Sequence, residues 1–314
     1  MKPTKANLNH NSHLRKIFIR FSIILISISK IYSQEIERPK AQPYTIEGTY
    51  EKLIKKYPFI QPLNLEFPKN IKVKKDVEYK TRNGKSLLAD IYYPENSAQK
   101  YPAIILVHGG GWISGSKENE RFLAQELASK GYVAMAINYS LSDDAKYPAA
   151  VEDIEDALKF LKKHHKEFTV NKKKIAVGGN SAGAQLATLV GVKNKVQAIV
   201  NIDGIVSFIH PDSEEGTYAA YWFGATKAQN FQIWKEASPL EYVGKRTPPT
   251  LFINSSQSRF HAGRDDMMKL LKNYNIPTEF HEIKDSPHSF WLVQPWFDET
   301  LKYTVDFLDK VLKN

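Results

Sequence analysis

The sequence predicts an α/β protein with a mostly parallel sheet and helices on both of its faces. Two observations support this prediction. From Pro102 onward, short apolar runs alternate with longer amphipathic segments, and repeated strand–helix units of this kind build parallel sheets. The apolar runs also lack polar alternation, which is typical of strands buried on both faces. With 314 residues, 42% of them hydrophobic, the chain is long enough for one large core.

The first 33 residues predict a secretory signal peptide. They contain six basic residues and no acidic one, and residues 21–28 form an apolar stretch of signal-peptide length. This stretch is too short to span a bilayer stably. We expect cleavage after Ser33, which leaves no stable membrane span and places the mature chain in the periplasm or outside the cell. Because Ile31 is not the small residue that such sites prefer, an uncleaved anchor is the alternative.

Charge and cysteine content exclude several functional classes. The net charge is +10, but six of these charges lie in residues 1–33, which leaves +4 for the rest. A charge of this size, spread over the mature chain, argues against a nucleic-acid partner. The chain has no cysteine, so thiol nucleophiles and cysteine-based metal sites are excluded.

Residues 34–70 are rich in Pro, Glu and Lys without a clear period, and they predict an extended N-terminal arm with a short helix near residues 51–56. A hairpin follows, because the pair Asn83-Gly84 lies between two strand-like runs, residues 77–80 and 87–93. An Asn-Gly pair in this setting favours a type I′ turn. The globular domain is expected to cover residues 71–314.

The alternating region resolves into individual elements by length and period. Apolar positions Val151, Ile154, Leu158 and Leu161 fall on one face of a helix, and Gly131 marks the end of the helix before it. Strands are predicted at residues 103–108, 132–138, 174–177, 196–202, 250–254 and 278–283, and helices at residues 118–130, 148–166, 182–190, 265–273 and 297–312.

Residues 205–247 interrupt this alternation. They contain eight aromatic residues among polar residues and glycines. An insertion between two strands of a sheet is a candidate lid or substrate wall. The alternative is that the aromatic side chains pack the inserted helices onto the core.

Three motifs point to nucleophilic chemistry, and the first contains Ser181. Gly179, Ser181 and Gly183 fit the pattern G-x-S-x-G, directly between a predicted strand and a predicted helix. This is the setting of a nucleophile elbow, in which small neighbours allow a tight, strained turn. The helix N-terminus would point its dipole at a developing oxyanion. An ordinary N-cap serine in a glycine-rich turn is the alternative.

The second motif is the run His108-Gly109-Gly110-Gly111-Trp112, which follows a predicted buried strand. Glycine N–H groups can approach a substrate oxygen closely, and we expect the amides of Gly109, Gly110 and Ala182 to form an oxyanion hole. Each such donor contributes about 3–4 kcal/mol to transition-state binding. A phosphate loop would need a Lys-Ser/Thr pair at a fixed spacing that this chain lacks.

The third motif is His288, on a loop after the last predicted strand. This position fits a general base in the chain order Ser, acid, His.

Together, residues 108–112, 147–153 and 175–183 resemble the hormone-sensitive-lipase-like branch of the α/β hydrolases. The chain is most similar to secreted bacterial members of the acetyl-xylan and feruloyl esterase type. The resemblance covers about residues 75–312. It implies the α/β-hydrolase fold with a mostly parallel eight-stranded sheet, a triad of Ser181, an acid and His288, and the glycine oxyanion hole.

The triad acid departs from this pattern. The family usually carries it just after the strand that is here residues 250–254, but the expected place holds Ser258. The candidates are Asp203, at the end of the preceding strand, and Asp265, in the first turn of the next helix. We favour Asp203, keep Asp265 as the alternative acid, and leave open that a polar residue orients His288 instead.

Four other residues are candidate substrate contacts: Trp112, Arg259, His261 and Trp291. Arg259 and His261 would suit an acidic sugar, with surface charge or a local ion pair as the alternative. Trp291 would stack on a sugar ring, with packing of the last helix as the alternative.

These features predict a serine esterase that transfers a short acyl group, acetyl above all, from a polysaccharide or small-molecule ester. No metal or organic cofactor is required for this chemistry. The alternatives are a serine peptidase of the same fold and a catalytically silent binding module. The sequence does not indicate an oligomeric state.

Overall fold

The structure, a computed structural model, describes residues 36–214 and 216–313. The predicted signal peptide, residues 1–33, lies outside the described residues. Residues 38–314 form one unit, built on an eight-stranded sheet of order β2-β3-β5-β4-β6-β7-β8-β9. The first two pairings, β2–β3 and β3–β5, are antiparallel, and all the others are parallel. The predicted fold class is confirmed.

The strands lie at the predicted positions, but β2 and β6 extend several residues beyond the predicted ends. Their bounds are β2 (Ile71–Arg82), β3 (Lys85–Pro94), β4 (Tyr101–Val107), β5 (Val133–Ile137), β6 (Val170–Asn180), β7 (Ala198–Ile202), β8 (Thr250–Asn254) and β9 (Thr278–Glu282). Every residue of β4, β5, β7 and β8 is buried, as apolar runs covered on both faces require. Asn83 and Gly84 both have positive φ, as a type I′ turn between β2 and β3 requires.

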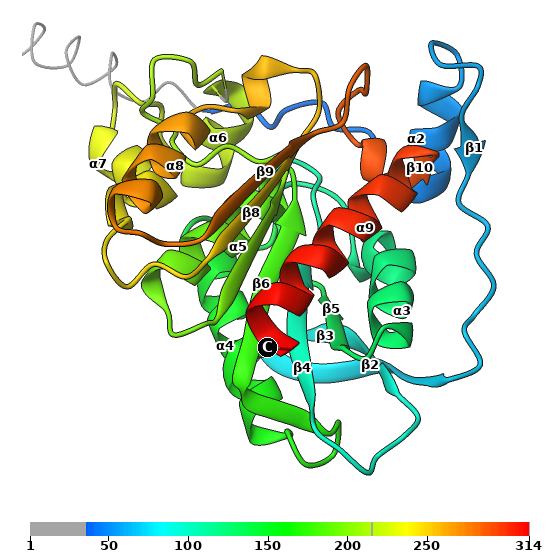
Figure 1. The fold of residues 1–314 in the computed structure, drawn as a ribbon. Helices are drawn as coiled ribbons and strands as arrows, with labels where there is room; N and C mark the ends of the chain where they lie inside the picture. Colours follow the sequence, from blue (N-terminus) through cyan, green and yellow to red (C-terminus); the bar gives the residue numbers. More distant parts are fainter. Residues whose placement is uncertain (1–35, 215, 314) are drawn as a thin grey trace, which may run out of the picture. The chain divides into compact units, whose positions relative to one another are not determined.

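Helices cover both faces of this sheet (Figure 1). On one face, α3 (Arg121–Ser129) packs beside α9 (Trp296–Leu308). On the other, α4 (Ala149–Lys163) contacts α5 (Ala182–Lys193), and the apolar side chains of α8 (Arg264–Asn273) join a small core with Val192 of α5. Among the described residues, no helix combines the length and apolar character that crossing a membrane requires.

The N-terminal arm contains a helix earlier than predicted. It is α2 (Ile46–Leu53), not residues 51–56. Thr45 begins it as the N-cap, because its side-chain oxygen accepts a hydrogen bond from the Gly48 amide at 3.0 Å. Further along the arm, β1 (Gln61–Pro62) pairs with β10 (Val293–Gln294), which ties the arm to the segment before α9.

The insertion forms two short helices, α6 (Gly216–Phe223) and α7 (Phe231–Glu236). Four of its aromatic residues are buried and contact one another: Phe208, Trp222, Phe223 and Trp234. For these four, packing onto the core is the correct interpretation. Trp222 also stacks on Trp112 with ring centroids 5.0 Å apart, so the insertion contacts the glycine loop after β4.

Candidate active site

Ser181 lies at the sharp turn between β6 and α5. Its backbone angles, φ 52° and ψ −124°, are strained for a residue with a side chain. The two glycines of the motif make this turn possible. A Cβ on Gly179 or Gly183 would overlap the Val107 carbonyl oxygen of the neighbouring strand. The turn therefore holds the Ser181 hydroxyl at the carboxyl edge of the sheet, ahead of the α5 N-terminus.

A chain of two hydrogen bonds joins Ser181, His288 and Asp203. The Ser181 Oγ lies 2.8 Å from His288 Nε2, and His288 Nδ1 lies 2.7 Å from Asp203 Oδ2. Because a carboxylate accepts hydrogen bonds, Nδ1 carries the proton, and Nε2 is left to accept from the serine hydroxyl. Residues that are distant in sequence thus form the arrangement that activates a serine for nucleophilic attack.

Asp203 is fully buried at the end of β7. Its second oxygen, Oδ1, accepts a hydrogen bond from the Ser255 amide at 2.8 Å and one from Asn254 Nδ2 at 3.2 Å. Burial alone would raise the pKa of Asp203, but the hydrogen bonds from His288 and Ser255 outweigh it and the pKa is lowered. The carboxylate therefore stays ionised beside His288.

The alternative acid, Asp265, does not meet His288. Its side chain is 82% exposed and pairs with Arg264 at 2.9 Å. It lies in the first turn of α8, where a carboxylate is favourable next to the helix N-terminus. Of the two acids considered, the structure brings only Asp203 to the base.

The imidazole of His288 is held between two aromatic rings. The Phe260 ring stacks on it with centroids 3.5 Å apart and an interplanar angle of 9°. Trp291 meets it edge-on at 5.1 Å. Trp291 is only 4% exposed, so its predicted role in sugar stacking is wrong: the ring has no open face for a sugar, and it supports the base instead.

The predicted oxyanion hole needs one correction. The Gly109 amide donates to Asn180 Oδ1 at 2.9 Å, so it is not available to a substrate oxygen. Gly110 and Gly111 supply the next two amides, and neither bonds another residue within 36–214 or 216–313. Both have positive φ, and Gly111 lines the same cavity as Ser181. The candidate donors are therefore the amides of Gly110, Gly111 and Ala182.

Asn180 links the glycine loop to a buried acid. While its Oδ1 accepts from Gly109, its Nδ2 donates to Glu120 Oε1 at 2.6 Å. Glu120 is 1% exposed, and burial raises its pKa to about 7, although the hydrogen bond from Asn180 acts the other way. The residue before the nucleophile thus fixes the position of the oxyanion loop through both ends of its amide.

The raised pKa of Glu120 should make the free energy of unfolding depend on pH. An acid with a raised pKa stabilises the folded state at low pH, and this contribution is lost as pH rises through the folded pKa. Relative to Glu120→Gln, the wild type should therefore lose about 2 kcal/mol of unfolding free energy between pH 5 and pH 8. Urea denaturation at both pH values measures this difference. The same substitution at Glu126, half-buried on α3, is the control, and equal pH dependence of wild type and Glu120→Gln would contradict the prediction.

His108 has a structural place in the loop. It is buried, and burial lowers its pKa to about 4, although a hydrogen bond to Gly109 opposes this. The neutral ring donates from Nδ1 to the Gly109 carbonyl oxygen at 2.7 Å and stacks on Tyr139. The general-base role therefore falls to His288 and not to His108.

The two basic candidates lie on the loop after β8. His261 Nε2 is 3.0 Å from the Ser255 carbonyl oxygen and 3.7 Å from Asp203 Oδ1, so its ring packs behind the triad acid. Arg259 lies with its guanidinium over the Phe260 ring at 4.8 Å. Both line a polar cavity that also has four carboxylates: Asp212, Glu214, Asp265 and Asp266. Because acids outnumber arginines there, the charge does not favour an acidic sugar.

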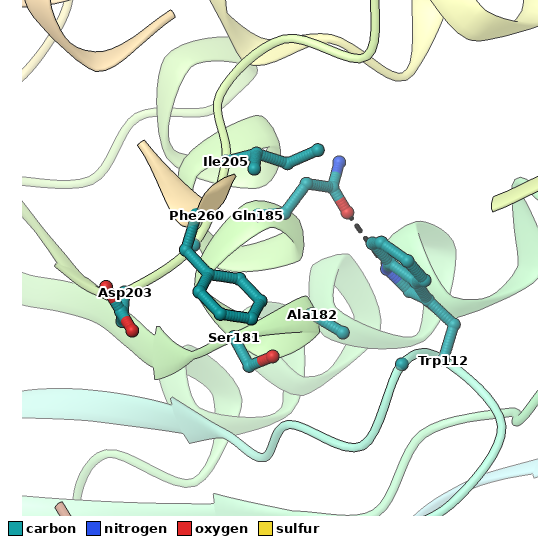
Figure 2. Close-up of a pocket in the computed structure, with 9 residues that line it drawn as sticks. Trp112, Ser181, Ala182, Gln185, Asp203, Ile205 and Phe260 are labelled. Carbon is teal, nitrogen blue, oxygen red and sulfur yellow. Dashed lines mark hydrogen bonds between the residues drawn. The ribbon is translucent and has the colours of Figure 1, made fainter. Parts of the chain in front are cut away.

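A small cavity of about 30 Å³ opens beside Ser181. Figure 2 shows Trp112, Gln185, Ile205 and Phe260, which line it together with Ser181. Trp112 is the one predicted substrate contact that lines it. The sequence interpretation missed Gln185, although its place four residues after Ser181 on α5 puts it on the same helix face. Ile205 and Phe260 carried no comparable signal.

Within residues 36–214 and 216–313, no group of three or more His, Asp or Glu side chains is arranged to hold a metal ion. What the site can do chemically is acyl transfer by Ser181, His288 and Asp203.

Comparisons with known proteins agree with this chemistry. Residues 89–260 match the family model BD-FAE. The chain is 35% identical to an acetyl esterase of Salmonella dublin over 224 residues, which are 64% of this chain and 68% of that protein. It is 27% identical to "Probable carboxylesterase 7" of Arabidopsis thaliana, over 77% of this chain and 89% of that protein.

Solved structures share the fold. A truncated carbohydrate esterase from gut microbiota superposes with a TM-score of 0.67 at 19% identity, covering 81% of this chain and all of that one.

Proposed function

The protein belongs to the BD-FAE family of α/β-hydrolase esterases, and from this premise we propose that it removes acetyl groups from carbohydrate esters. The observation that carries the proposal is the hydrogen-bonded chain from Ser181 through His288 to Asp203, next to a cavity of about 30 Å³. A cavity this small favours a short acyl group over a long one.

The reaction begins with attack of the Ser181 Oγ on the ester carbonyl carbon while His288 Nε2 takes the hydroxyl proton. The carbonyl oxygen becomes an oxyanion that accepts hydrogen bonds from Gly110, Gly111 and Ala182. Asp203 stabilises the imidazolium that forms. When the carbon–alcohol oxygen bond breaks, His288 returns the proton to the leaving alcohol.

Water completes the cycle. It attacks the acetyl-Ser181 carbonyl while His288 takes its proton, a second oxyanion forms in the same place, and Ser181 leaves as its hydroxyl is reprotonated. The products are the alcohol and acetate, and water is the only reactant besides the ester.

Two kinds of relative support the substrate class. The most similar curated relatives include an acetyl esterase, and the structural neighbours include a carbohydrate esterase from gut microbiota. The experiment is to incubate residues 34–314 with acetylated xylan and with p-nitrophenyl acetate, and to measure acetate and p-nitrophenol. Release from both substrates is expected. Turnover of the nitrophenyl ester without release from any acetylated glycan would leave an esterase and remove the carbohydrate from the proposal.

We also propose that the protein is exported. The basis is the basic, acid-free segment of residues 1–33 with its apolar stretch. Expression of the full chain in a bacterial host should yield a mature protein in the periplasm or medium that begins at Gln34. N-terminal sequencing of the fractionated protein measures this, and an intact Met1 in the cytoplasmic fraction would contradict it.

A further inference from the structure

The cavity beside Ser181 borders the candidate oxyanion donors and the start of the inserted segment. Ser181 lines it together with Gly111 and Ala182, two of the candidate oxyanion donors. An acyl carbonyl bonded to the Ser181 Oγ places its oxygen at these donors and its alcohol toward His288. The remaining substituent, the acyl chain, then points into the cavity, toward Trp112, Gln185 and Ile205 (Figure 2).

The far wall of the cavity is held by hydrogen bonds on both sides of Gln185. Its Oε1 accepts from Trp112 Nε1 at 3.0 Å, and its Nε2 donates to the Ala237 carbonyl oxygen at 2.8 Å. Gln185 is 1% exposed and Trp112 is 2% exposed. If either side chain moved, buried polar groups would lose their partners, which is unfavourable.

The inserted segment, residues 205–247, supports this wall from behind. Ala237 belongs to it, and so does Trp222, whose ring stacks on Trp112 at an interplanar angle of 7°. Ile205, which is 3% exposed, begins the insertion and closes the cavity next to Gln185. The insertion thus acts as a fixed wall around the acyl group.

From this arrangement we propose that Gln185, held between Trp112 and Ala237, together with Ile205 limits the acyl group to acetyl size. The inference rests on the proposed function, because it takes Ser181 as the nucleophile. An aliphatic wall can shift to admit two more methylene groups. The Gln185 amide, which is hydrogen-bonded at both ends, resists this shift. A butyryl ester should therefore be a poor substrate.

Two variants test separately how the size of the cavity and the rigidity of its wall affect the choice of acyl group. Ile205→Ala enlarges the cavity and leaves both Gln185 hydrogen bonds in place. Gln185→Leu keeps a side chain of similar volume and removes both bonds, so that Trp112 is free to move. The controls are the same substitutions on α7, Ile233→Ala and Gln232→Leu, at positions that do not line the cavity.

The readout is the ratio of kcat/KM for p-nitrophenyl butyrate to that for p-nitrophenyl acetate. We expect the wild type and both controls to favour acetate by about a hundredfold or more, since a pocket discriminates by roughly tenfold or more per methylene group and a butyryl group has two more of them. Ile205→Ala and Gln185→Leu should each raise the ratio at least about tenfold. The rates of Ser181 labelling by p-nitrophenyl methylphosphonate and propylphosphonate esters give the same comparison in a single chemical step, because their alkyl groups match those of acetyl and butyryl esters.

The outcomes distinguish this inference from the proposed function. An active wild type that accepts butyrate as well as acetate, or a ratio unchanged in both cavity variants, overturns the inference and leaves the esterase. A wild type that neither hydrolyses the esters nor is labelled by the phosphonates overturns the proposed function and the inference with it. If one variant does not fold, the other still decides.

Discussion

Ser181→Ala should lower kcat on p-nitrophenyl acetate by at least about 10⁴-fold, which leaves only the catalysis that binding and the oxyanion donors provide. The loss is this large because the covalent route depends on one oxygen atom. Ser181 Oγ is the group that His288 Nε2 contacts, at 2.8 Å, and alanine offers nothing to attack the ester carbon.

The fold of this variant should be unchanged. The Ser181 backbone keeps its positive φ because the elbow is held by the packing of Gly179 and Gly183 against Val107, and none of these contacts involves the hydroxyl. Equal melting temperatures of variant and wild type check this. Activity that survives in a folded Ser181→Ala protein would mean that another nucleophile does the chemistry.

Asp203→Asn should lower kcat by about 10⁴-fold. An asparagine in this place fills the same volume, but its amide can turn an NH₂ group toward His288 Nδ1. The imidazole then takes the tautomer with a proton on Nε2, which cannot accept from Ser181. The substitution also removes the negative charge that stabilises the imidazolium while the acyl group is transferred.

Asp265→Asn is the matched control and should change kcat by less than about twofold, because its side chain is 82% exposed and forms its ion pair with the neighbouring Arg264. Steady-state kinetics on the same acetate ester measures both variants. A collapse of Asp265→Asn with an active Asp203→Asn would reverse the assignment of the acid. Full activity in both would mean that His288 needs no carboxylate.

Much of this protein follows from local sequence patterns. Buried strands such as β8, at Thr250–Asn254, are apolar runs of strand length, and they lie where the sequence predicts them. The Asn83-Gly84 turn follows from the two positive φ angles that these residues tolerate. The elbow at Ser181 follows in the same way, because only small residues permit the tight turn between β6 and α5. These features depend on neighbours in the chain, so the sequence carries them directly.

Other features depend on partners far away in the sequence. Asp203 and Asp265 both follow sheet strands, and only the position of β7 brings one of them to His288, 85 residues further on. Gly109 and Gly111 are equivalent in the motif. The Gly109 amide nevertheless donates a hydrogen bond to Asn180, which lies 71 residues further along the chain. Trp291 has the kind of side chain that often stacks on sugar rings, but here it is buried against His288.

Local patterns in the sequence thus predicted the main strands and helices along the chain, the turn at Ser181, the candidate base and the family. Only the three-dimensional arrangement shows which acid contacts His288, which glycine amides remain open to a substrate, and that Gln185 and Ile205 line the cavity beside Ser181. The physical reason is that a strained turn or an apolar period is a property of adjacent residues. Whether an amide or a carboxylate is free is decided by hydrogen bonds that form only when distant segments meet.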